Sequence, residues 1–177
     1  LHDNGLDRGN LLQQTEGNAR YGHSDKDVAG AGGTSWAAVE HHRAKRRRDQ
    51  LAQMLGEMLW DWGIPTAVSL FEVVQVVKIP VIASGGIRSG KDAAKALALG
   101  ASLVGVASPV LFPALKNSEE VKKMLSFMIN QLRNTMFLVG AGSVSKLRSS
   151  PVVLTGKTAE WLKARGFNPE SYARRSL

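Results

Sequence analysis

Two short segments of this 177-residue chain carry residues suited to holding a phosphate group. The stretch SGGIR (84–88) directly follows one apolar run, and GVAS (105–108) closes the next. Glycine accepts φ > 0 and lets the backbone approach a ligand closely, so its N–H groups can point at phosphate oxygens. Arg88 would add a charge-assisted, two-pronged hydrogen bond. A pair of ordinary strand-to-helix turns is the alternative interpretation, and the residue types alone leave both open.

The elements that must position these segments form a βαβ unit. Residues 79–84 and 102–107 are apolar runs rich in β-branched residues, which is typical of strands buried on both faces. Between them, Ser89 and Asp92 are spaced as a capping box for a helix over 90–99. Short connections predict parallel neighbouring strands, whose carboxyl ends are where α/β sheets bind ligands. A helix after Pro109 would add a positive N-terminus there, as in the phosphate sites of eight-stranded α/β barrels.

The rest of the chain is organised around this unit. Residues 1–26 show no periodicity and are rich in turn formers, so we expect a poorly structured N-terminal segment. A very short strand is expected from Asp27, followed by one helix from Trp36 to Trp62, because apolar residues in its second half recur at spacings of three and four. Pro65 favours a helix beginning near Thr66, with a strand as the alternative. A long helix with an apolar stripe over 121–136 is expected to pack into the core.

Composition limits the classes of function. Lys and Arg number 23 and Asp and Glu 15, so the net charge is +8, which suits an anionic ligand. The chain has no cysteine, which excludes disulfides, thiolate metal sites and a cysteine nucleophile. No apolar stretch approaches the ~20 residues that span a bilayer, and the first residues do not form a secretory signal. We therefore expect a soluble cytoplasmic protein that binds neither membrane nor nucleic acid, with the cations of 43–48 on a solvated helix face.

Several motifs resemble the C-terminal half of the type 2 isopentenyl-diphosphate isomerases. In chain order they are DVAGAGGTSW, WGIPT, IPVIASGGIRSGKDAAKALALGA, LVGVASP and TGKTAEWLKARGF. The resemblance implies an α/β fold with the parallel strands of a (β/α)8 TIM barrel, of which residues 27–177 would form the incomplete, C-terminal part. It also implies FMN and Mg²⁺ as cofactors, NADPH as the flavin reductant, isopentenyl and dimethylallyl diphosphate as substrate and product, and a homo-oligomer.

The resemblance assigns roles residue by residue. The residues that match cofactor-binding positions are Thr34, Gly85, Gly86, Ile87, Arg88, Ala107 and Ser108. Trp36 matches a tryptophan beside the substrate, and Glu40 matches a carboxylate proposed for acid–base chemistry, although a solvated helix carboxylate is equally consistent with its position. The faint match of LHDNGLD to LHxNPLQE places His2 and Asn4 on the substrate side. Ala29 replaces a flavin-contacting serine of many relatives.

The resemblance also has departures. A (β/α)8 barrel takes about 200 residues or more, and the strands that carry most substrate contacts and a flavin-contacting lysine are not recognisable. Asp7 and Arg8 fall where relatives have a glutamine and a glutamate, so the metal ligands are unknown. Two functions remain open: an FMN-dependent isomerase in truncated or divergent form, and a non-catalytic remnant that keeps a flavin-phosphate cradle. An FMN-dependent barrel oxidoreductase is a weaker third, because no His-x-x-Arg pair follows GAGGTSW.

Overall fold

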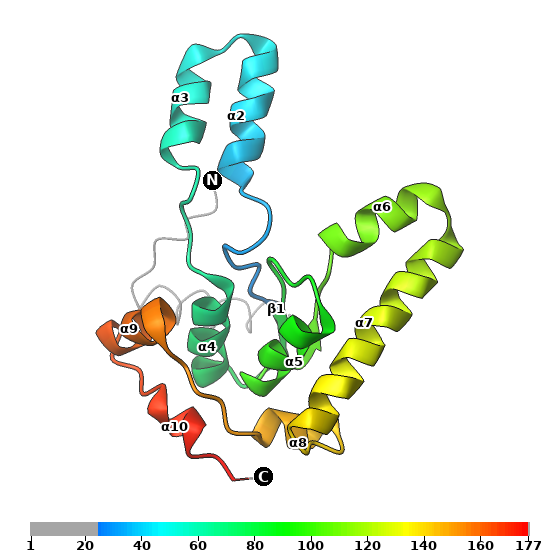
Figure 1. Ribbon diagram of the computed structural model, residues 1–177. Coiled ribbons are helices and arrows are strands. Elements are labelled where there is room, and N and C mark those ends of the chain that lie inside the picture. Colours follow the sequence, from blue (N-terminus) through cyan, green and yellow to red (C-terminus); the bar gives the residue numbers. More distant parts are fainter. Residues whose placement is uncertain (1–24, 177) are drawn as a thin grey trace.

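A small parallel sheet lies at the centre of the protein, with helices packed around it and two helical arms extending from it (Figure 1). The computed structural model describes residues 25–176. The strands are β1 (Lys26–Asp27), β2 (Val81–Ala83) and β3 (Leu103–Val104). The helices are α2 (Trp36–Arg47), α3 (Gln50–Met58), α4 (Thr66–Val76), α5 (Gly90–Ala98), α6 (Ser108–Lys116), α7 (Ser118–Leu138), α8 (Val144–Ser149), α9 (Gly156–Ala164) and α10 (Glu170–Ala173). The predicted N-terminal segment 1–26 lies almost wholly outside the described residues.

The sheet has the order β1-β2-β3, and both neighbouring pairs are parallel. Ile82 is the central residue, aligned with Asp27 of β1 and with Leu103 of β3. The predicted pairing of 79–84 with 102–107 is therefore confirmed, although the regular ladders are shorter than the apolar runs. All three carboxyl ends meet at one edge of the sheet, and this edge carries the candidate site.

The crossover between β2 and β3 is helix α5, as the sequence predicts. The Ser89 hydroxyl caps it by accepting a hydrogen bond from the Asp92 N–H (3.1 Å). Its alanine-rich face is buried against two apolar clusters, one shared with α4 and β2 and the other with α8. The ambiguous segment after Pro65 is helix α4, which buries Val68, Leu70 and Phe71 on more than one side.

The expectation of a single helix from Trp36 to Trp62 is wrong, because this segment forms a hairpin of two helices, α2 and α3. Arg48 adopts a left-handed backbone (φ 60°), and its N–H bonds the carbonyls that end α2. Asp49 then caps α3 by accepting a hydrogen bond from the Ala52 N–H (3.0 Å). The two helices pack on each other and stand away from the sheet (Figure 1).

Helices α6 and α7 form the second arm, and α7 packs against α5. Gly90, at the start of α5, lies directly on the α7 backbone near Met128, and its N–H donates to the Gln131 side chain (2.8 Å). The apolar stripe predicted for the core is buried only in part. Met128 is 8% exposed, whereas Leu125 and Ile129 are 39% and 48% exposed.

The end of the chain returns to the carboxyl end of α5. The Tyr172 hydroxyl donates to the Leu99 carbonyl (3.3 Å), and Arg175 donates to the Ala98 carbonyl (2.9 Å). Arg148 donates to the Gly100 carbonyl (3.2 Å). Carbonyls at a helix C-terminus lack partners within the helix and carry partial negative charge, so these donors satisfy and neutralise them.

Candidate functional site

A pocket of about 560 Å³ lies at the carboxyl edge of the sheet. This is the size of a typical small-molecule site. It is walled by three segments that follow the ends of β1, β2 and β3, together with the two tryptophans at the base of the α2–α3 hairpin. The lining residues are Asp27, Ala29, Gly30, Ala31, Gly33, Thr34, Trp36, Trp62, Gly63, Ser84, Gly85, Gly86, Ile87, Arg88, Gly105, Val106, Ala107 and Ser108.

The glycines of the second segment are required by their conformation and by their neighbours. Gly85 and Gly86 have φ of 95° and 85°, in the region that disfavours side chains. A Cβ on either would overlap the carbonyl oxygen of Gly30 or Gly32, so the loops after β1 and β2 lie in direct contact. The Thr66 hydroxyl also donates to the Gly85 carbonyl (2.6 Å). Gly85 is therefore held by elements on both of its sides.

The donor set of the pocket suits an oxyanion. Within residues 25–176, the N–H groups of Gly86, Ile87, Ala107 and Ser108 donate to no other residue. The last two lie at the N-terminus of α6, where no side chain caps the helix and its dipole favours an anion. The Arg88 side chain is exposed and belongs to no ion pair among the described residues. N–H groups without a described acceptor, from two neighbouring strand ends, and an unpaired guanidinium thus line one pocket, and we call this set of donors a candidate anion cradle.

Asp92 fixes the backbone of Arg88. Its Oδ2 accepts hydrogen bonds from the Arg88 N–H (3.3 Å) and from the Ser89 hydroxyl (2.8 Å). Partial burial acts to raise the pKa of Asp92, but the Ser89 and Arg88 hydrogen bonds and the charge of Lys95 outweigh it and lower that pKa below its ordinary value of 3.8. Asp92 is therefore ionised near neutral pH, and it orients the loop that presents Arg88.

Some residues of the pocket are ones that the sequence analysis missed. Asp27 is the carboxylate that lines it, and its Oδ1 accepts hydrogen bonds from the Ser84 hydroxyl (2.6 Å) and the Ala29 N–H (3.1 Å). These bonds join the end of β1 to the end of β2 and hold Ala29, whose φ is 36°. Ser84 gave a usable signal, because it ends the predicted strand 79–84, whereas Asp27 was expected to begin a strand and in the structure ends β1. Trp62 had no such signal, since only the hairpin brings it to the pocket.

The structure brings together the predicted cofactor-binding residues, because Thr34 and the members of 85–88 and 107–108 all line the pocket. Trp36 and Ala29 also line it. Glu40 does not. It lies on the exposed surface of α2, paired with Arg43 (2.6 Å), and both side chains are 56% exposed. His2 and Asn4 lie outside the described residues.

The described residues fit a flavin phosphate better than a metal ion. The cradle offers N–H donors and a guanidinium, which match phosphate oxygens. Within residues 25–176, no group of three or more His, Cys, Asp or Glu side chains is arranged to hold a metal. No Mg²⁺ ligand is therefore assigned to this part of the chain. The helices among these residues include none with the length and hydropathy to cross a bilayer.

The fold and the site together define a class. The sequence model of the FMN-dependent dehydrogenase family matches residues 59–154, more than half of the chain and including both cradle segments, and the chain belongs to that family. A crystal structure of GMP reductase from Trypanosoma brucei superposes with a TM-score of 0.56 at 19% identity, over 84% of this chain and 34% of that one. At this identity, the likeness shows that the α/β fold is shared.

Curated relatives narrow the class further. The isopentenyl-diphosphate delta-isomerase of Methanothermobacter thermautotrophicus is 57% identical over 155 residues, which are 88% of this chain and 43% of that protein. Proteins of the same name from Methanosarcina mazei and Pyrococcus furiosus are each 52% identical, over 83% and 81% of this chain. These matches are 40% and 36% of the relatives, so the chain spans about two-fifths of the length of the curated relatives it matches.

Proposed function

We propose that this chain is the flavin-phosphate part of an FMN-dependent isopentenyl-diphosphate delta-isomerase. The observation that carries the proposal is the cradle at the carboxyl ends of β2 and β3, where free N–H groups and Arg88 converge. The named relatives, at 50–57% identity over most of the chain, support the isomerase over other members of the family. In this proposal β1–β3 belong to the C-terminal part of a (β/α)8 barrel.

The proposed reaction gives the residues distinct tasks. Shifting a double bond requires a proton at one carbon and the loss of a proton from a neighbouring carbon, and bound reduced FMN would supply electron density and a protonatable nitrogen beside the alkene. Arg88 and the free N–H groups would hold the flavin phosphate. Trp36 and Trp62 would exclude water from the open side of the pocket, and Thr34 would contact the flavin. Asp27 is the titratable carboxylate available among the described lining residues, whereas Glu40 would need a rearrangement of α2 to reach the pocket.

Finer expectations accompany this proposal. We expect Mg²⁺ to accompany the substrate diphosphate, NADPH to reduce the flavin, the chain to form homo-oligomers and the location to be cytoplasmic. Each follows from the resemblance or from composition. Mg²⁺ would be held by ligands other than a cluster within 25–176, since those residues provide none.

The experiment that tests the flavin site compares FMN with riboflavin. The purified chain is titrated with each compound, and binding is read from the visible spectrum and from quenching of flavin fluorescence. A phosphate cradle predicts saturable FMN binding that is weakened at least ~10-fold when the phosphate is missing, because the charge-assisted hydrogen bonds are lost. Equal affinities, or no binding of either flavin, would remove the cradle as the basis of the proposal.

A second candidate is a flavin-binding remnant without catalysis. It is favoured by the coverage, since the chain aligns with only about two-fifths of its relatives, and by the position of Glu40 outside the pocket. FMN binding without formation of dimethylallyl diphosphate, in the presence of a reductant and Mg²⁺, would support this candidate. Formation of that product would support the isomerase.

A further inference from the structure

Helix α3 carries an apolar stripe that no other described residue covers. Leu51, Met54, Leu55 and Met58 are 70%, 67%, 48% and 72% exposed. Their spacing of three, four and seven residues places them on one side of the helix, which is the pattern of a helix–helix contact surface. We call these four residues the α3 stripe.

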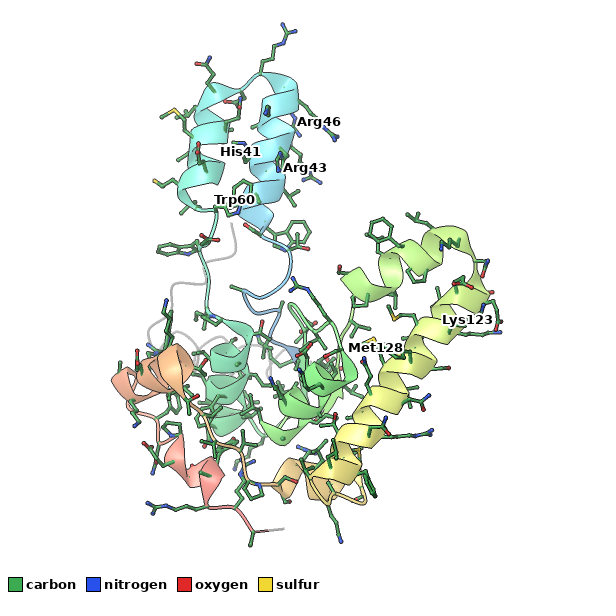
Figure 2. All side chains as sticks on the ribbon, viewed as in Figure 1. His41, Arg43, Arg46, Trp60, Lys123 and Met128 are labelled. Carbon is green, nitrogen blue, oxygen red and sulfur yellow. The ribbon has the colours of Figure 1, made fainter. Side chains whose placement is uncertain are left out.

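The α3 stripe is not needed within the hairpin, because the opposite side of α3 makes that contact. Gly56 is buried against α2, where a Cβ would crowd the Ala37 carbonyl and His41. The His41 ring also hydrogen-bonds the Gln53 carbonyl (2.9 Å). Figure 2 shows His41 and Trp60 on the inner side of the hairpin, and Arg43 and Arg46 on the side of α2 that faces away from α3. The hairpin is thus complete as a pair, and the α3 stripe is its outer surface.

Charge is unequally distributed along the hairpin. The cations Lys45, Arg46, Arg47 and Arg48 lie at its tip, where α2 ends. Glu57 and Asp61 lie at its base, where α3 ends. All six side chains are exposed, and none belongs to an ion pair within residues 25–176. Asp49, at the start of α3, offsets one of the four tip cations, so the hairpin has a net positive tip and a negative base with an apolar surface between them.

We propose that the α3 stripe is the contact surface for the same stripe of a second copy of this chain, with the two hairpins antiparallel about a two-fold axis. In this arrangement the positive tip of each hairpin lies beside the negative base of the other. The arrangement that brings the two apolar stripes into contact therefore also pairs opposite charges. A parallel arrangement would place the two positive tips side by side. A two-fold contact uses one patch twice, as one self-complementary face requires.

The proposal specifies a surface for the self-association expected above and does not depend on flavin. An anionic lipid surface is a poorer match for the hairpin, because such a surface would attract the positive tip and repel the negative base. The polar positions of α3 are Gln50, Gln53 and Glu57, none of them cationic, so the helix lacks the positive face of an interfacial membrane helix.

The first test measures mass in solution. The molar mass of the full chain is determined by light scattering over a range of concentrations, for the wild type, for Met54→Glu and for Phe127→Glu. Phe127 is a matched control, since it is 59% exposed but lies on α7. We expect Met54→Glu to weaken self-association at least ~10-fold and Phe127→Glu to leave it unchanged, because burying a charge at a contact centre is strongly unfavourable. A monomeric wild type, or equal effects of the two variants, would overturn the proposal.

The second test determines whether the two hairpins are antiparallel or parallel. The chain has no native cysteine, so single engineered cysteines report their own contacts. In the antiparallel pair the middle of the stripe meets itself, so Leu55→Cys should cross-link to its own copy. Leu51→Cys should cross-link to Met58→Cys when the two variants are mixed, and each much less to itself. Self-cross-linking of Leu51→Cys as rapid as in the mixture would overturn the antiparallel arrangement.

Controls distinguish this proposal from its rivals. Far-UV circular dichroism and FMN titration of Met54→Glu show whether the fold and the pocket persist, so that a lost dimer is read separately from a lost flavin site. Sedimentation of the wild type with anionic vesicles, abolished by Met54→Glu without a change in mass, would assign the stripe to a membrane surface and overturn the dimer. A dimer that Met54→Glu dissociates while FMN binding stays intact would support it.

Discussion

In the proposed site the backbone of Arg88 is bound by Asp92, and its side chain would be bound by the flavin phosphate. Asp92 and Ser89 fix the backbone, while the guanidinium belongs to no ion pair among the described residues. The backbone of Arg88 is therefore ordered before an anion binds, so that binding has to order only the exposed side chain.

Replacing Arg88 with alanine should weaken FMN binding by ~1.5–3 kcal/mol, the scale of a hydrogen bond to a charged group. Lys91→Ala is the matched control, because Lys91 is an exposed cation three residues away that does not line the pocket. Flavin fluorescence titration of both variants gives the comparison. An Arg88→Ala affinity equal to that of Lys91→Ala would exclude Arg88 from the phosphate contacts.

Asp92 should make the stability of the chain depend on pH. Its pKa is lowered in the folded state, so its contribution is present above the ordinary value of 3.8 and is lost as pH falls through the lower folded value. Urea unfolding of the wild type and of Asp92→Asn isolates this group from other carboxylates. The wild type should be the more stable of the two at pH 6, and the difference should shrink below about pH 4. A difference that stays constant with pH would contradict the linkage.

The site could be predicted from sequence where it follows strand ends and not where it depends on the hairpin. Gly85, Gly86 and Arg88 follow a recognisable buried run, so their role follows from the general position of ligands in α/β sheets. Trp62 reaches the pocket only because α2 and α3 fold back on each other. The hydrogen bond from the Ser84 hydroxyl to Asp27 was not predictable either, since it joins residues 57 positions apart.

Among the elements, the βαβ unit was predictable because three local signals agree there: apolar runs, a capping box and short connections. The hairpin was not, because periodicity beginning at Leu51 was extended back through a segment with no apolar pattern. The stop signal was present in Asp49, which favours an N-cap position. The apolar stripe of α7 was predicted correctly as a pattern but is covered only in part, because α5 and α6 pack on it and still leave Leu125 and Ile129 exposed.

Gly90→Ala should separate α5 from α7. The added Cβ would overlap the Met128 carbonyl and the Leu132 N–H, which are backbone atoms that cannot rotate away. Overpacking of this kind costs about 1–3 kcal/mol in the free energy of unfolding. Gly142→Ala is the control, because nothing lies within 4 Å of a Cβ at that position. Chemical denaturation measures both, and similar stabilities of the two variants would contradict the packing described for α5.

The whole molecule presents a candidate anion cradle on a three-stranded sheet, in a chain that spans about two-fifths of its relatives. We therefore expect FMN binding to be retained and isomerase turnover to be absent. We expect this chain, tested alone with FMN, a reductant and Mg²⁺, to form no dimethylallyl diphosphate at a useful rate. Loss of substrate positioning alone can forfeit ~7–11 kcal/mol of barrier reduction. Turnover comparable to that of a full-length relative in the same assay would contradict this expectation.

One buried ion pair joins distant parts of the molecule. Glu72 of α4 is 1% exposed and accepts two hydrogen bonds from Arg165, just after α9 (3.1 and 3.3 Å). Arg165→Met would leave the carboxylate buried without a partner, and should lower the free energy of unfolding by about 3 kcal/mol. Lys163→Met removes the exposed pair with Glu170 and should cost less than about 1 kcal/mol. Equal losses in thermal or urea unfolding would show that burial does not distinguish the two pairs.

The donors that close the carboxyl end of α5 have a consequence for the order of folding. Tyr172 bonds Leu99 and Gln75 across 73 and 97 positions, and Arg175 bonds Ala98 across 77. Contacts this distant in sequence raise the contact order and slow the search for the native state. During synthesis, α5 would leave the ribosome long before the residues that cap it, since translation adds about 5–20 residues per second. For roughly several seconds the carbonyls at the end of α5 therefore bond to water alone, and the last residues to be synthesised replace that water with the Tyr172 and Arg175 donors.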